Sequence, residues 1–190
     1  MIRLYSKKTT SRIIEENRAW IDEVAARYQM PAALICAVMQ REMQEIDLLD
    51  VGADLAVRMG GLIKKDSSTG PMQIFGSVGL RAVNFGVDHG LTTYEALGIS
   101  STHRLDPNSR EDRRLVWNRL YSDPKANIEI AALNLVSAAE EMTGRIDFDS
   151  YSEEELKHIL TRYNQDTSRI TAYGEEVYRY FLAYGGREGG

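Results

Sequence analysis

The segment Pro31-Ala32-Ala33-Leu34-Ile35-Cys36-Ala37-Val38-Met39-Gln40-Arg41-Glu42 carries the strongest structural signal in this sequence. Pro31 suits the first position of a helix, because the N–H that proline lacks would have no helical partner there. The positions that recur at helical spacing and predict a helix to about residue 45 are Leu34, Ile35, Val38 and Met39. The segment therefore predicts an apolar helix with a carboxylate at the end of its apolar stripe.

Glu42 takes the next position on the same helix face, because residues three and four apart lie above one another. A carboxylate on that face is partly desolvated, which favours its protonated form and suits a general acid. Glu45 falls on nearly the same face, so helix geometry leaves both residues open. The simpler alternative is an acidic side chain that reaches solvent from the end of an apolar stripe.

The rest of the chain is also mostly helical by its hydrophobic periodicity. Further helices are expected over about 11–29, 73–84, 91–97 and 108–121. Residues 46–71 are expected to be irregular, with a short helical piece around 52–59. No segment has the alternation of a strand, and we find no repeat or linker. The sequence predicts one mainly α domain over residues 1–190, with at most a small β element.

Local end signals mark three more helices. Asp123-Pro124 is typical of an N-cap and first helical position, and Gly144 of the stop that follows. Ser152 and Glu155 have the spacing of a capping box that opens a helix to about Tyr163. The last helix is expected to end at Gly185-Gly186.

Composition excludes several classes of protein. The 23 Lys and Arg against 28 Asp and Glu give a formal net charge of −5, which argues against nucleic-acid binding and against adsorption to anionic membranes. The single cysteine, Cys36, excludes an internal disulfide and a cysteine-rich zinc site, and we expect it to be a buried small residue. The three histidines lack metal-ligand spacing, so we expect neither a metal nor another cofactor.

Two short motifs admit both a structural and a functional interpretation. Ser67-Ser68-Thr69-Gly70-Pro71-Met72-Gln73-Ile74 predicts a tight turn that leads directly into a helix, and its backbone and Gln73 could line a groove. Tyr163-Asn164 closes a helix and is typical of a cap with a packing ring. The same pair could instead place a phenol and an amide beside a carboxylate.

The order of these elements resembles a known family. Glu42 closes an apolar helix, Gly70-Pro71-Met72-Gln73-Ile74 is similar to that family's Gly-Leu-Met-Gln, Asp123-Pro124-x-x-Asn127-Ile128 opens a long helix, and Tyr163-Asn164 comes last. This succession, over about residues 20–184, resembles the soluble lytic transglycosylase and goose-type lysozyme group of the lysozyme-like superfamily. The departures are Met43 after the glutamate, Pro71 in the Gly-Met-Gln motif, and Gln165-Asp166 after Tyr-Asn.

The resemblance implies a lysozyme-like fold and cleavage of the β-1,4 bond between N-acetylmuramic acid and N-acetylglucosamine in peptidoglycan. It implies Glu42, in preference to Glu45, as the catalytic acid/base. Gly70, Met72 and Gln73 would line the saccharide groove, and Tyr163 and Asn164 would orient Glu42 or the cleaved sugar.

Hydrolysis needs a second carboxylate that holds a water, at about 6.5–9.5 Å from the acid in inverting enzymes. Asp66 is the candidate for this task, with Asp47, Asp50 and Asp54 as rivals in the same loop. Without such a group the sugar's own 6-hydroxyl attacks, as in lytic transglycosylases, and leaves a 1,6-anhydro end. The alternatives are a catalytically inactive binding or structural module, and a chitinase or chitosanase on the same fold.

The start of the chain has no apolar run of signal-peptide length, and no window approaches about 18 apolar residues. We therefore expect no membrane insertion and no Sec-type signal. A wall-cleaving enzyme of this kind would reach peptidoglycan after lysis or through delivery machinery, and an injected toxin would be matched by an immunity or inhibitor protein.

Overall fold

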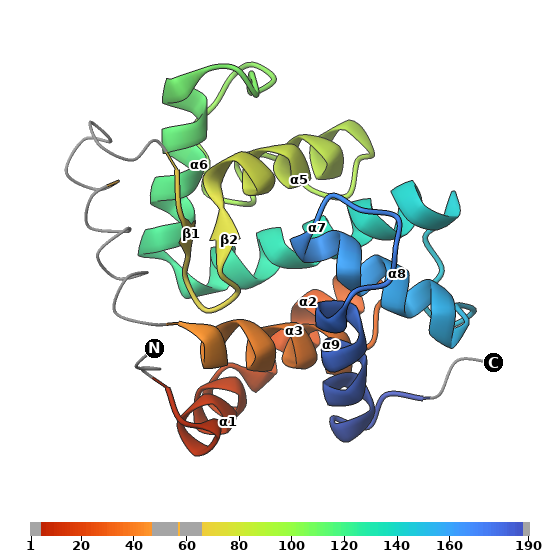
Figure 1. Ribbon diagram of the computed structural model, residues 1–190. Coiled ribbons are helices and arrows are strands. Elements are labelled where there is room, and N and C mark those ends of the chain that lie inside the picture. The colour runs from red at the N-terminus through yellow and green to blue at the C-terminus, as the bar shows by residue number, and fades with distance from the viewer. Residues whose placement is uncertain (1–4, 47–56, 58–65, 188–190) are drawn as a thin grey trace. The chain divides into compact units, whose positions relative to one another are not determined.

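The computed structural model describes residues 5–46, 57 and 66–187, and this part of the chain is mainly helical (Figure 1). Its helices are α1 (Lys7–Glu16), α2 (Arg18–Arg27), α3 (Ala32–Glu45), α5 (Gly76–Asp88), α6 (Arg110–Ser122), α7 (Pro124–Thr143), α8 (Glu153–Asn164) and α9 (Ala172–Ala183). The strands β1 (Ser68–Thr69) and β2 (Ile74–Phe75) form one two-stranded sheet. The predicted fold class, mainly α with at most a small β element, is confirmed.

The chain divides into two compact units, each built from two separate stretches. Unit 1 comprises Met1–Ser6 and Glu42–Asn134, and unit 2 comprises Lys7–Arg41 and Leu135–Gly190. The boundaries fall inside α3 and α7, which are both almost wholly buried over their central turns. These helices are buried all round, not along one stripe.

In unit 1, α5 packs against α6, and the β hairpin lies beside both (Figure 1). Gly79 permits a close approach of the two helices, since a Cβ atom there would lie 2.9 Å from Leu120 Cδ1. Trp117 of α6 is buried and donates from Nε1 to the Ser67 carbonyl at 3.1 Å, which ties α6 to the start of the hairpin.

In unit 2, α8 packs against α9 (Figure 1). The predicted capping box is present: Ser152 Oγ accepts from the Glu155 N–H at 3.3 Å, and Glu155 Oε2 accepts from the Ser152 N–H at 2.9 Å. Gly174 allows α9 to approach α8, because a Cβ atom there would lie 2.6 Å from the Lys157 carbonyl oxygen.

The predicted ends of α7 and α9 are also confirmed. Asp123 Oδ1 accepts from the Lys125 N–H at 2.8 Å, as expected of an N-cap residue. Gly144 directly follows α7 and Gly185 follows Tyr184, the C-cap residue of α9; the two glycines adopt positive φ angles of 72° and 85°.

Three local expectations were wrong. The helix predicted over 11–29 is divided at Asn17, whose side chain donates to the Ile13 carbonyl at 2.8 Å and competes with the backbone there. The helix predicted from residue 73 begins at Gly76, because residues 74–75 pair with β1. Residues 91–97 form no helix; the turns over residues 94–98 end at Gly98, which adopts a φ of 67°. The short helical piece predicted around 52–59 lies outside the described residues, except for residue 57.

Candidate functional site

Glu42 lies in the last turn of α3, and its side chain is only 9% exposed. Met39 and Met43, close to it along the same helix, are 0% and 3% exposed. Glu45, in the same turn, is only half-buried. Burial therefore distinguishes two residues that helix periodicity alone could not separate.

The turn of the β hairpin is held by its own side chains. β1 and β2 are antiparallel, with Ser68 opposite Phe75 and Thr69 opposite Ile74. Gln73 Nε2 donates to the Gly70 carbonyl at 2.8 Å, and Gln73 Oε1 accepts from Ser68 Oγ at 3.1 Å. Gln73 adopts a φ of 43°, and these bonds compensate for that backbone strain.

Asn127, at the start of α7, fixes this turn from inside unit 1. Its side chain is fully buried, Oδ1 accepts from the Met72 N–H at 2.9 Å, and Nδ2 donates to the Thr69 carbonyl at 2.9 Å. One side-chain amide therefore binds both sides of the turn. The Asn127 side chain leaves no room for a side chain at residue 70, which explains the glycine there.

Asp66 anchors the other end of the hairpin. Its Oδ1 accepts from the Gly76 N–H at 2.8 Å, and its Oδ2 accepts from the Ser77 N–H at 2.9 Å. A carboxylate is favourable there, because the first N–H groups of a helix lack intrahelical partners. The structure thus gives Asp66 a capping task at the start of α5. Its rivals Asp47, Asp50 and Asp54 lie outside the described residues.

The predicted site residues are shared between the two units. Glu42, Asp66, Gly70, Met72 and Gln73 belong to unit 1, and Tyr163 and Asn164 belong to unit 2. Met72 is fully buried. In unit 2, Tyr163 is 7% exposed, and Asn164 is exposed at the last position of α8.

Unit 1 holds a further buried carboxylate that the sequence reasoning missed. Glu129, on α7, is 3% exposed. The signal was available in Ile128-Glu129-Ile130-Ala131, where an acid interrupts an apolar run. Asn127, two residues earlier in the same helix, was also not predicted to position the turn. Its partners are about 55 residues away in sequence, and no local rule links them.

Cys36 is fully buried, as predicted, and burial raises the pKa of its thiol to about 11.

Among residues 5–46, 57 and 66–187, no group of three or more His, Cys, Asp or Glu side chains is placed to hold a metal ion. No helix in the described part of the chain is long and apolar enough to cross a membrane.

Comparison with protein-family models, with curated proteins and with solved structures gave no significant match to this chain.

Proposed function

We propose that the protein cleaves the β-1,4 bond between N-acetylmuramic acid and N-acetylglucosamine in peptidoglycan, with Glu42 as general acid/base. The observation that carries the proposal is the burial of Glu42 at the end of an apolar helix. Glycosidic cleavage requires a protonated carboxyl group beside the leaving oxygen, and removal from water is a usual way in which proteins favour that form of a carboxyl group. The order of motifs along the sequence supplies the substrate class.

In the proposed reaction, the Glu42 carboxyl group gives its proton to the glycosidic oxygen as the bond from C1 to that oxygen breaks. Positive charge then develops at C1, as in other glycosidases. The resulting Glu42 carboxylate accepts the proton of the hydroxyl group that attacks C1, so the residue returns to its starting state.

The proposal assigns the attacking hydroxyl to the sugar's own C6. Both oxygens of Asp66 already accept backbone N–H groups at the start of α5, so capping accounts for this residue without a catalytic water. Intramolecular attack would leave a 1,6-anhydro end, whereas attack by water would leave a reducing end. The two products differ in mass by one water molecule.

The hairpin turn supports the proposal as a rigid edge for a saccharide. Asn127 and Gln73 hold the backbone of the turn by hydrogen bonds on both sides, and such support keeps binding groups in place before substrate arrives. We propose that the backbone at Gly70 and the Gln73 side chain contact the sugar.

The deciding experiment compares wild type with Glu42→Gln in turbidity and zymography assays on purified peptidoglycan, with mass analysis of the products. Loss of the acid should reduce the rate by about 10²–10⁴-fold, with circular dichroism and thermal unfolding unchanged. Glu45→Gln is the matched control on the same helix turn and should retain activity.

Glu129→Gln tests the other buried carboxylate of unit 1. Undiminished lysis by Glu42→Gln, or loss of lysis only in Glu129→Gln, would overturn the assignment of the acid. A wild-type protein that binds wall fragments but cleaves neither peptidoglycan nor chitin oligomers would instead be an inactive binding module.

A further inference from the structure

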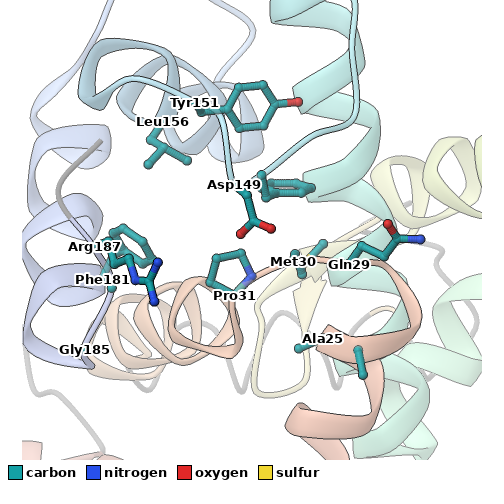
Figure 2. Close-up of a pocket in the computed structure, with 13 residues that line it drawn as sticks. Ala25, Gln29, Met30, Pro31, Asp149, Tyr151, Leu156, Phe181, Gly185 and Arg187 are labelled. Atoms are coloured by element: carbon teal, nitrogen blue, oxygen red, sulfur yellow. The ribbon is translucent and has the colours of Figure 1, made fainter. Parts of the chain in front are cut away.

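Unit 2 contains a pocket of about 820 Å³ that none of the residues proposed for sugar cleavage lines (Figure 2). Its walls come from the end of α2 with the residues after it, from the loop before α8, and from the end of α9 with the residues after it. The volume lies within the range of about 300–1,000 Å³ that is usual for small-ligand sites. The pocket is therefore large enough for a peptide of a few residues.

Two opposite charges line this pocket. Asp149 and Arg187 are both exposed, and neither forms a hydrogen bond or ion pair through its side chain with any other residue in the described part of the chain. In Figure 2, Arg187 lies beside Phe181 at one side, and the Asp149 carboxylate points toward Pro31 between Arg187 and Gln29. Ligand charges can reach both groups without breaking an existing pair.

Apolar side chains fill the surface around these charges. Met30, Tyr151, Leu156 and Phe181 all line the pocket, and each is largely buried. The pocket therefore offers a ligand one cationic group, one anionic group and an apolar surface.

Gln29, at the side of the pocket opposite Arg187 (Figure 2), is held in an unfavourable backbone conformation. Its φ is 50°, at the position after a helix where glycine is usual. The surrounding hydrogen bonds, from the Gln29 N–H to the Ala26 carbonyl at 3.3 Å and from the Met30 N–H to the Ala25 carbonyl at 3.0 Å, need no side chain at residue 29. Glycine would adopt this backbone conformation at lower cost, yet residue 29 is a glutamine, and it lines the pocket.

We propose that this pocket binds a short peptide that ends in a free carboxylate and carries a cationic residue just before its last residue. The carboxylate pairs with Arg187, the cationic group with Asp149, and the preceding peptide group hydrogen-bonds to Gln29. Aliphatic parts of the peptide lie against Leu156 and Phe181. The pocket and its charges carry this inference independently of the glycosidase proposal.

The test is an NMR titration of the full chain with N-acetyl-alanyl-lysyl-alanine. Asp149→Asn and Arg187→Gln should each weaken binding by about fivefold, as expected for exposed charge pairs. Both side chains are exposed, so neither substitution should disturb folding. The matched controls are Asp147→Asn and Arg179→Gln, which change exposed charges of the same unit that do not line the pocket.

Peptides that lack one of the two charges test which pocket residue binds that charge. Asp149→Asn should not weaken binding of the peptide in which glutamine replaces lysine, and Arg187→Gln should not weaken binding of the C-terminal amide. Gln29→Gly should weaken binding of the lysine peptide while the Tm stays at or above that of wild type.

The same peptide chemistry occurs in the stem peptides of peptidoglycan and at protein C-termini. Tighter binding of the peptide that ends in D-alanine would point to the wall, and tighter binding of the all-L peptide to a protein terminus. Glu42→Gln should leave binding unchanged, so this proposal and the glycosidase proposal can fail separately. The inference is overturned if millimolar peptide causes no shifts at the pocket, or if the control variants weaken binding as much as the pocket variants.

Discussion

Asn127 and Gly70 are in such close contact that a Cβ atom at residue 70 would lie 2.5 Å from Asn127 Cγ. The same Asn127 amide bonds to Thr69 and Met72, on either side of that glycine. The hairpin turn and the start of α7 are therefore one packed structure, and a change at either residue should be felt at the other.

Gly70→Ala should destabilise the protein more than the backbone angle alone predicts. The φ of 71° costs an L-residue about 1–2 kcal/mol, and displacement of the Asn127 amide adds about 1–3 kcal/mol. Gly90→Ala is the control, because Gly90 has a similar φ of 67° with nothing within 4 Å of the added atom. Urea unfolding of both variants measures the difference, and equal losses would contradict the tight fit at Gly70.

Asp66→Asn separates capping from catalysis. We expect a loss of about 1 kcal/mol in the free energy of unfolding, because asparagine keeps one acceptor but loses the charge at the start of α5. Wall lysis and the mass of its products should not change at a temperature where the variant is folded. A selective loss of products with reducing ends would show that Asp66 holds a catalytic water after all.

Glu155 should make stability depend on acid pH. The Ser152 N–H and the Arg145 guanidinium hold the pKa of this carboxyl below its ordinary value of 4.5. Its stabilising contribution is therefore present above pH 4.5 and is lost as the pH falls through the lower, folded-state value. Glu155→Gln keeps an acceptor for the Ser152 N–H, should cost under about 1 kcal/mol at neutral pH, and should flatten the acid limb of a plot of unfolding free energy against pH.

Cys36 should make stability depend on alkaline pH in the opposite sense. Burial raises the pKa of its thiol from 9.0 to about 11, so the folded state holds the proton that the unfolded state releases. The contribution is complete below pH 9.0 and is lost as the pH rises toward 11, by on the order of 2 kcal/mol. The difference between wild type and Cys36→Ala isolates it, and iodoacetamide should label Cys36 only after denaturant is added.

Helix ends set by local chemistry were predictable from the sequence. Each of these signals acts on residues close to it in sequence and can therefore be recognised as a local pattern. They are the Asp123 cap, the Ser152–Glu155 capping box and the glycines at residues 144 and 185. The division at Asn17 depends on a hydrogen bond from one side chain to a backbone carbonyl, and hydrophobic periodicity carries no information about that bond. The two-residue strands are too short for alternation to be visible.

For the candidate site, the apolar run before Glu42 left two alternatives open, a partly desolvated carboxylate and a side chain that reaches solvent, and in the structure Glu42 is 9% exposed. The partners of Asn127 and Trp117 could not be predicted, because their hydrogen bonds span 50 residues or more. Likewise, Asp149 and Arg187 lie in segments with no motif, and only the fold of unit 2 brings both to one pocket.

The interleaving of the two units governs how the protein can be divided. Neither unit is a continuous length of chain, and the boundaries at residues 41–42 and 134–135 lie within α3 and α7. The stretch 42–134 would begin inside α3 and end inside α7, and the stretch 135–190 would begin inside α7 without the Asp123 cap. No single continuous fragment can therefore reproduce unit 2, whose residues 7–41 and 135–190 would have to be supplied as two pieces that associate.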